Sequence, residues 1–294
     1  MSVRCVYDRK EGSSMAVKWS TRWRWETGYS ADSAEWCPVE PYRRLLVVGT
    51  YQLEEHADEN TKELSPIQTI ETAGVLDQKW CYHKIHDRPI LAAVTSVGTI
   101  QFYQLLDEDG TLSLKLWLEH AIGQDVLALS LDWSTNKTYS EEPGLVVSDS
   151  SGSVTVLKVA EGLEEVGRWK THGFEAWIAA FNYWNTDVFY SGGDDCLFKS
   201  YDTRVPDALV ATNRSHEAGV TAVRIRTWDT RKLKSCVTET DVGGGVWRLK
   251  WHPTRSDLVV AACMYGGFRL LRRDSVVAEY REHESIAYGA DWSH

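Results

Sequence analysis

The chain has 294 residues, 43% of them hydrophobic, and a formal net charge of −10. This hydrophobic content supports a sizeable core and argues against wholesale disorder. The acidic balance argues against nucleic acid as a partner, and no apolar run is long enough to predict a membrane-spanning helix. Six scattered cysteines without a Cys-x-x-Cys pair predict free, buried thiols rather than a metal site.

The first 28 residues do not share the pattern of the rest of the chain. Within them, Val, Trp and Thr side chains alternate with polar ones over residues 17–25, a period of two that is typical of a strand. We interpret residues 1–28 as a separate segment that lends this strand to the last sheet of the domain formed by residues 29–294. The segment lacks the apolar core of a secretory leader, so we expect a cytoplasmic protein.

From residue 30 onward one kind of segment recurs, a short run of alternating apolar and polar residues that in most cases ends in Trp. Its period is that of a strand whose side chains point alternately to the two faces of a sheet. Seven such segments span residues 30–38, 74–82, 126–134, 175–184, 219–226, 244–253 and 286–293.

A hairpin signature follows most of these segments. In PGLVVSDSSGSVTVLKV (143–159), for example, two β-rich runs flank a small polar turn. A third, shorter run such as ALVAT (208–212) comes next. Each repeat thus predicts one four-stranded antiparallel sheet, which is a propeller blade. We predict an all-β, WD40-type propeller of about seven blades.

Three blades are predicted to be incomplete. Residues 53–64 are polar where the first blade should have its third strand. Trp184 and Trp251, which end the fourth and sixth segments, lie 67 residues apart, too far for one blade of about 40–45 residues and too close for two. We therefore expect the fifth blade to lack its second strand and most of its third. The seventh blade is expected to hold only its first strand and the N-terminal one.

Several strings are more specific than a generic WD repeat. They are SADSAEWCP (30–38), LALSLDWSTNKT (127–138), HGFEAWIAAFNYW (172–184), YSGGDD (190–195), GGGVWRLKWHP (243–253) and YGADWS (288–293). Through these strings, in this order from about Tyr29 to Ser293, the chain resembles the eukaryotic diphthine methyltransferase family of diphthamide biosynthesis.

Despite that family name, the resemblance implies a carboxylic-ester hydrolase. It would remove the methyl ester of methylated diphthine on elongation factor 2 and leave diphthine. The implied partner is elongation factor 2 carrying methylated diphthine, and we expect a monomer that uses no cofactor or metal. Two alternatives stay open, namely a non-catalytic WD-repeat scaffold for protein–protein interaction and an inactive, shortened variant of the esterase.

Ester hydrolysis needs an activated nucleophile or water, a base, and donors for the developing oxyanion. The sequence has no Gly-x-Ser-x-Gly or His-Glu-x-x-His motif, so such a site must be assembled from loops of different blades. The candidates are polar residues expected near blade turns: His120, His172, His216, His283, Asp149, Asp194 and Asp195. In WD folds, such His and Asp residues often join a buried network that fixes the blade.

The strongest catalytic candidates are in blade four. His172 lies near Glu175, Asp194 and Asp195 in the predicted loops, and a His beside carboxylates can serve as a general base. Core packing is favoured over a substrate cage for three tryptophans of apolar strands, Trp177, Trp184 and Trp247.

Overall fold

A computed structural model describes most of the chain, and every regular element in its described residues is a β-strand. No helix in this part of the chain is long and apolar enough to cross a membrane. The described residues are 2–4, 20–23, 27, 30–51, 66–205, 207–216, 219, 224–229, 231, 235–282 and 286–293.

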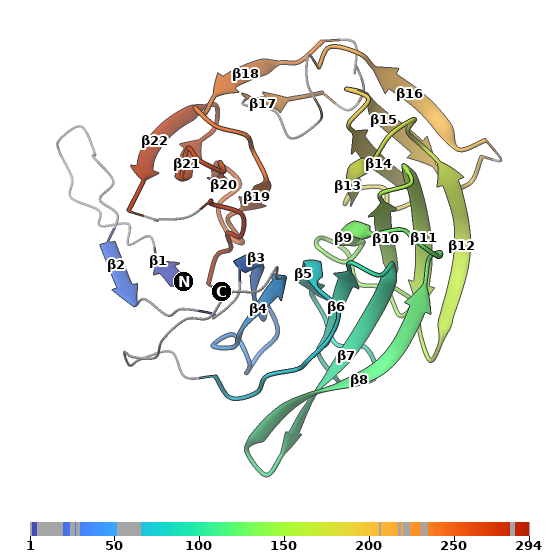
Figure 1. Ribbon diagram of the computed structural model, residues 1–294, viewed down its shortest axis with the longest axis vertical. Coiled ribbons are helices and arrows are strands. Elements are labelled where there is room, and N and C mark those ends of the chain that lie inside the picture. The colour runs from blue at the N-terminus through green and yellow to red at the C-terminus, as the bar shows by residue number, and fades with distance from the viewer. Residues whose placement is uncertain are drawn as a thin grey trace.

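The strands form antiparallel sheets arranged in a ring around a central axis (Figure 1). Four sheets are complete four-stranded blades. Two of them consist of β5 (Val75–Trp80), β6 (Ile90–Thr95), β7 (Thr99–Glu108) and β8 (Thr111–Ala121), and of β9 (Ala128–Trp133), β10 (Gly144–Asp149), β11 (Ser153–Val159) and β12 (Leu163–Lys170). The others consist of β13 (Ala176–Phe181), β14 (Val188–Gly193), β15 (Phe198–Asp202) and β16 (Leu209–Asn213), and of β19 (Arg248–Trp251), β20 (Leu258–Ala262), β21 (Phe268–Arg272) and β22 (Ser275–Tyr280).

Two ring positions hold only two described strands each. The first blade consists of β3 (Ser30–Trp36) and β4 (Leu46–Tyr51), and the fifth of β17 (Arg224–Thr227) and β18 (Thr238–Asp241). In Figure 1, β17 and β18 lie toward the outside of the ring, and the Thr240 hydroxyl donates to the Asp274 carbonyl of blade six at 2.7 Å. The predicted all-β propeller is confirmed. Residues 53–64, on which the prediction for blade one was based, lie outside the described residues.

The N-terminal segment contributes two described strands, β1 (Ser2–Arg4) and β2 (Ser20–Trp23), which pair with each other. In Figure 1 both lie near the C-terminal end of the chain. Most of residues 1–28 lie outside the described part of the chain, so closure of the ring by this segment stays a prediction.

Second strands are apolar because each blade packs between two others. All six residues of β6, the second strand of its blade, are buried. Phe102 of this blade lies edge-on to Trp133 of the next blade, with ring centroids 6.1 Å apart. Burying a large apolar side chain contributes about 1.5–3 kcal/mol, so such inter-blade layers supply much of the stability of the ring.

An Asp–Trp pair at the end of inner strand β9 connects adjacent blades. Asp132 Oδ2 accepts the N–H of Phe181 in the next blade at 3.1 Å, and Trp133 Nε1 donates to the Lys79 carbonyl of the previous blade at 2.9 Å. Trp133 is fully buried. The two bonds fix the backbone of one inner strand to both of its neighbours.

The same pair closes the ring at the C-terminal end. Asp291 Oδ2 accepts the N–H of Trp36 in the first blade at 2.8 Å, and Trp292 Nε1 donates to the Lys250 carbonyl of the sixth blade at 2.9 Å. Residues 286–293 therefore occupy the inner position of the seventh blade, although they form only an isolated bridge to Met264.

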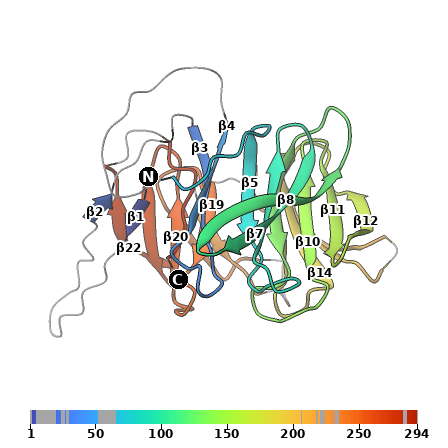
Figure 2. The same ribbon diagram turned by 90° about the horizontal axis from the view of Figure 1, so that it is seen from below.

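Neighbouring inner strands run in the same direction. The N–H groups of Ala179 and Phe181 in β13 donate in order to the side chains of Ser130 and Asp132 in β9. Seen edge-on, the strands run along the axis of a disc (Figure 2). We call the face of the disc at which the inner strands begin the entry face.

Two tryptophans predicted in the apolar strands are exposed. Trp184 is 82% exposed, because β13 ends at Phe181 and the chain turns away three residues before the indole. Trp251 is 61% exposed. Trp133 bonds a carbonyl of the blade that precedes its own, and the blade that precedes Trp251 is the fifth. The two described strands of the fifth blade lie away from the axis (Figure 1). The predicted core packing of Trp184 is therefore wrong.

Candidate active site

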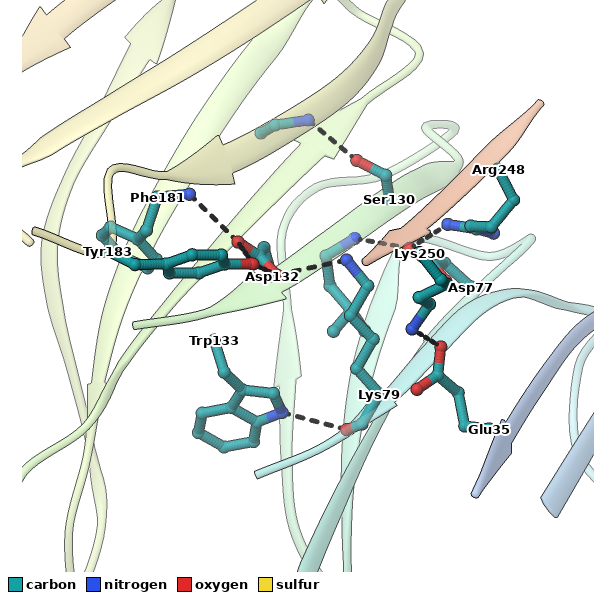
Figure 3. Close-up of polar contacts among 12 residues, drawn as sticks. Glu35, Asp77, Lys79, Ser130, Asp132, Trp133, Phe181, Tyr183, Arg248 and Lys250 are labelled. Atoms are coloured by element: carbon teal, nitrogen blue, oxygen red, sulfur yellow. Dashed lines mark hydrogen bonds and ion pairs between the residues drawn. The ribbon is translucent and has the colours of Figure 1, made fainter. Parts of the chain in front are cut away.

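Charged side chains from several inner strands contact one another (Figure 3). Lys79 Nζ lies 3.2 Å from Asp132 Oδ1 on the neighbouring strand. Arg248 Nη1 of blade six reaches Asp77 Oδ2 of blade two at 2.9 Å, and Asp77 is fully buried. Asp77 Oδ2 also accepts the N–H of Leu131 in β9 at 3.0 Å, so this carboxylate joins neighbouring inner strands as well as the arginine.

A second buried group combines two carboxylates with one ammonium. Lys250 Nζ bonds Glu35 and lies 3.9 Å from Asp291 Oδ1. Burial raises the pKa of Glu35 to about 8, and the nearby Asp291 carboxylate adds to the rise while Lys250 opposes it. Burial alone would lower the pKa of Lys250, but the two carboxylates outweigh it and raise that pKa. Lys250 therefore stays charged at neutral pH.

Asp32 lies at the entry face, near the start of β3. Its side chain is 3% exposed, and its Oδ2 is buried without a hydrogen-bond partner in the described residues. Burial raises the pKa of Asp32 to about 7. The charge of Arg248 opposes this rise, Asp77 adds to it, and a hydrogen bond from the Trp247 side chain lowers the pKa slightly.

A carboxyl group with these properties is suited to proton transfer. With a pKa near 7 it exists in both protonation states at neutral pH, which is the condition for an efficient general acid or base. The free Oδ2 can accept a proton or hydrogen bond from a molecule that enters. A buried polar atom without a partner is costly, and a substrate or water at this position would satisfy it.

Three aromatic side chains pack against one another beside Asp32. The rings of Trp177 and Trp247 lie 5.9 Å apart at 59°, and those of Trp247 and Tyr288 lie 5.1 Å apart at 63°. All three side chains are half-buried. Burial, together with a hydrogen bond and charge interaction with Tyr288 and the nearby Asp32, raises the pKa of Tyr51 to about 12. Trp177 of blade four and Trp247 of blade six touch directly, although the fifth blade lies between them in chain order.

The predicted partners His172 and Asp195 do meet, within a buried network. His172 Nδ1 lies 2.8 Å from Asp195 Oδ1, and Nε2 lies 2.9 Å from Ser191 Oγ. The order Ser–His–carboxylate matches a hydrolase triad, but the His172 side chain has no exposed surface and Ser191 is 1% exposed. Burial lowers the pKa of His172 and outweighs the attraction of Asp195. Both ring nitrogens of His172 have partners within the blade, so the geometry favours a role in fixing the blade.

Glu175 and Asp194, the other two predicted catalytic residues, lie apart from that network. The backbone N–H of Asp194 donates to the Glu175 carbonyl at 2.9 Å. Asp194 Oδ1 accepts the Trp177 indole N–H at 3.2 Å, which places this carboxylate beside the aromatic rings of the entry face. A catalytic role for His172, Glu175, Asp194 or Asp195 stays a prediction.

The remaining candidates have other surroundings. Asp149 Oδ2 accepts from Arg168 of outer strand β12 at 2.7 Å. His120 lies on outer strand β8 beside a carboxylate. The ring nitrogens of His216 have no hydrogen-bond partner in the described residues. His283 lies outside them.

The residues predicted at blade turns do not include Asp32, Asp77 and Arg248, which lie on inner strands. A signal for them exists in the sequence. The segments 30–38, 74–82 and 244–253 carry charged residues among apolar ones, and the inner strands of a propeller bring such residues together at its axis. Period-two alternation could have placed these charged side chains on the face of each strand that points to the axis. It could not have predicted that Arg248 of blade six pairs with Asp77 of blade two.

The ring of antiparallel blades joined by Asp–Trp pairs defines a WD-type propeller with a charged centre and an aromatic entry face. No protein-family model matches the chain. A chain of the mitotic checkpoint complex has a similar structure, with a TM-score of 0.61 and 15% identity over 90% of this chain and 84% of its own, which shows the fold.

Curated relatives define the family more narrowly. Diphthine methyltransferase of Mus musculus is 37% identical over 91% of this chain and 68% of its own length, and that of Homo sapiens is 36% identical over 91% and 73%. A diphthine methyltransferase homolog of Dictyostelium discoideum is 33% identical over 90% of both chains. The chain belongs to the diphthine methyltransferase family.

Proposed function

We propose that the chain hydrolyses the methyl ester of methylated diphthine on elongation factor 2, in the cytoplasm, and leaves diphthine. Family membership supports a methyl-related step of diphthamide biosynthesis. The observation that carries hydrolysis is Asp32, a buried carboxyl group with a pKa of about 7 and a free oxygen at the entry face. Such a group can activate water at neutral pH.

The proposed reaction proceeds through attack of water on the ester carbonyl. The Asp32 carboxylate takes a proton from water as its oxygen bonds the carbonyl carbon. The tetrahedral oxyanion is stabilised by the positive charge of Arg248, which faces Asp32 and is held by Asp77. The intermediate then breaks its bond to the methoxy oxygen, which takes the proton from Asp32 and leaves as methanol. The diphthine carboxylic acid that remains ionises to solvent.

The test is hydrolysis of elongation factor 2 bearing methylated diphthine in water enriched in oxygen-18. The account predicts methanol release by catalytic amounts of the chain without any methyl donor, and one heavy oxygen in the new carboxylate. Transfer of the methyl group to another acceptor, or a requirement for a methyl donor, would show that the family name describes the reaction of this chain literally and that the hydrolase proposal is wrong.

A non-catalytic scaffold is the second candidate, and exposed aromatic side chains favour it. Trp184, Trp251 and Tyr265 are 82%, 61% and 85% exposed, and aromatic residues of this kind are enriched at protein interfaces. A scaffold would hold elongation factor 2 equally well before and after removal of the ester. Tight, persistent binding of the demethylated protein, with no turnover, would favour the scaffold over the esterase.

A further inference from the structure

We propose that a groove between blades three and four binds an extended peptide in which lysine or arginine flanks apolar side chains. The groove opens at the face of the disc where the inner strands end, opposite the entry face. Ser134, which follows β9, and Thr186, which precedes β14, both line it. It encloses about 620 Å³, within the range of about 300–1,000 Å³ that is usual for binding sites. Because Asp32 lies at the other face, the proposal does not depend on the proposed hydrolysis.

The floor of the groove is apolar. Val156 and Phe181 belong to the buried layer between the two blades, and both line the groove where this layer reaches the surface. Val166 of outer strand β12 adds a side chain that is 38% exposed. It is the extra residue of a β-bulge, because the pairing of β11 with β12 shifts between Val156 and Leu157. A bulge redirects a side chain, and this one leaves a valine open to a molecule in the groove.

The rim of the groove is acidic. Among the described residues that line it, the carboxylates of Glu141, Glu142 and Asp187 outnumber the single ammonium of Lys158. Glu141 forms no ion pair within the part of the chain that the structure describes. Glu142 lies 3.9 Å from Lys158, and Asp187 lies 3.3 Å from Arg204, all four side chains being about half exposed. Exposed pairs of this kind contribute little, so the three carboxylates can form new ion pairs with a bound cation.

A basic peptide fits both the floor and the rim. Its apolar side chains would cover the floor, and the aliphatic stems of lysine or arginine would extend across apolar surface to the carboxylates. The hydroxyl groups of Thr138 and Thr186 also line the groove and can bond the backbone of an extended peptide. The chain as a whole carries a net charge of −10, which attracts a basic partner and speeds association. An acidic peptide would meet like charges at the rim.

The test is fluorescence polarisation of the labelled hexapeptide Lys-Arg-Val-Leu-Arg-Lys, titrated with the whole chain at about 150 mM salt, where charges beyond about 8 Å are screened. The proposal predicts saturable binding at least about tenfold tighter than that of Glu-Glu-Val-Leu-Glu-Glu, since each exposed ion pair is worth up to about fivefold. Lys-Arg-Ser-Ser-Arg-Lys, which lacks the apolar side chains, should also bind at least about tenfold more weakly. No saturable binding of the first peptide, or equal affinity for all three, would overturn the proposal.

Variants test whether the peptide lies in this groove. Glu141→Gln combined with Glu142→Gln should weaken binding of the basic peptide about tenfold. The matched control, Glu108→Gln with Asp109→Asn, makes the same change of charge at exposed positions beside the turn between β7 and β8 and should leave binding unchanged. Asp32→Asn should also leave it unchanged. Binding that is weakened by Asp32→Asn but not by the two glutamate changes would place the peptide at the entry face and overturn the proposal.

A second copy of the chain is the competing occupant of the groove. Sedimentation of the wild type and of the variant with Glu141→Gln and Glu142→Gln, each over a range of concentrations, distinguishes the two. The proposal predicts that both stay monomeric. A dimer that forms in the wild type and is lost in the variant would assign the groove to a second copy and rule out the peptide as its occupant.

Discussion

Replacing Asp32 by Asn should stabilise the fold at alkaline pH. In the folded protein the pKa of Asp32 is raised from 3.8 to about 7, so between these values the folded state holds a proton that the unfolded state has lost. Stability rises with pH only where the unfolded state binds more protons, so here it falls as the pH rises toward 7. Asn stays neutral at every pH and does not incur this loss.

The magnitude follows from the two pKa values. A change from 3.8 to about 7 corresponds to about 4 kcal/mol of stability lost by pH 8.5. About 2 kcal/mol of this is lost between pH 5.5 and 8.5. The advantage of Asp32→Asn over wild type should therefore grow by about 2 kcal/mol across this interval. Glu35 also titrates near pH 8, but it does so in both proteins and cancels in the difference.

The assay is urea unfolding followed by tryptophan fluorescence at pH 5.5 and 8.5, with free energies taken by linear extrapolation. Asp109→Asn is the matched control, because Asp109 is exposed in the turn between β7 and β8, and its difference from wild type should not depend on pH. If the difference between wild type and Asp32→Asn is the same at both pH values, Asp32 is not a buried group of raised pKa and the reasoning fails.

Three further predictions concern activity and the ring. Removing the imidazole with His172→Ala leaves buried partners unsatisfied and should cost about 1–3 kcal/mol in the free energy of unfolding. The kcat of the folded variant should stay near wild type. A folded but inactive variant would show that this network is catalytic. Asp291→Ala breaks the ring-closing bond to Trp36 and should speed hydrogen exchange of the Trp36 amide, and an unchanged rate would argue against closure by residues 286–293. Methanol release should increase as the pH rises through about 7, the pKa of Asp32, because a general base works when deprotonated; a flat profile would exclude this role.

The fold could be read from the sequence because its signal is local. Alternation within 126–134 predicts a strand without knowledge of its neighbours, and β9 spans Ala128–Trp133. Spacing alone predicts a short fifth blade. The described residues there form β17 and β18, and its missing strands stay a prediction. The exposure of Trp184 was not visible, because it depends on where β13 leaves the sheet.

The candidate site could be predicted only in part, because its properties arise from distant residues. His172 and Asp195 are separated by one hairpin, and their pairing follows from the blade. The surroundings of Asp32 include Trp247 and Arg248, more than 200 residues away. Its pKa depends on burial at the ring axis, which no local pattern specifies, and a single Asp in an apolar strand gives no sign of it.

The account is tested most directly by methanol release from elongation factor 2 bearing methylated diphthine at pH 8, with wild type beside folded Asp32→Asn. Loss of a general base costs about 10²–10⁴ in rate, so the account predicts that the variant is at least about 100-fold slower while its stability at this pH is higher. A variant that releases methanol within a few-fold of the wild-type rate would contradict it, because the ester would then be hydrolysed without Asp32.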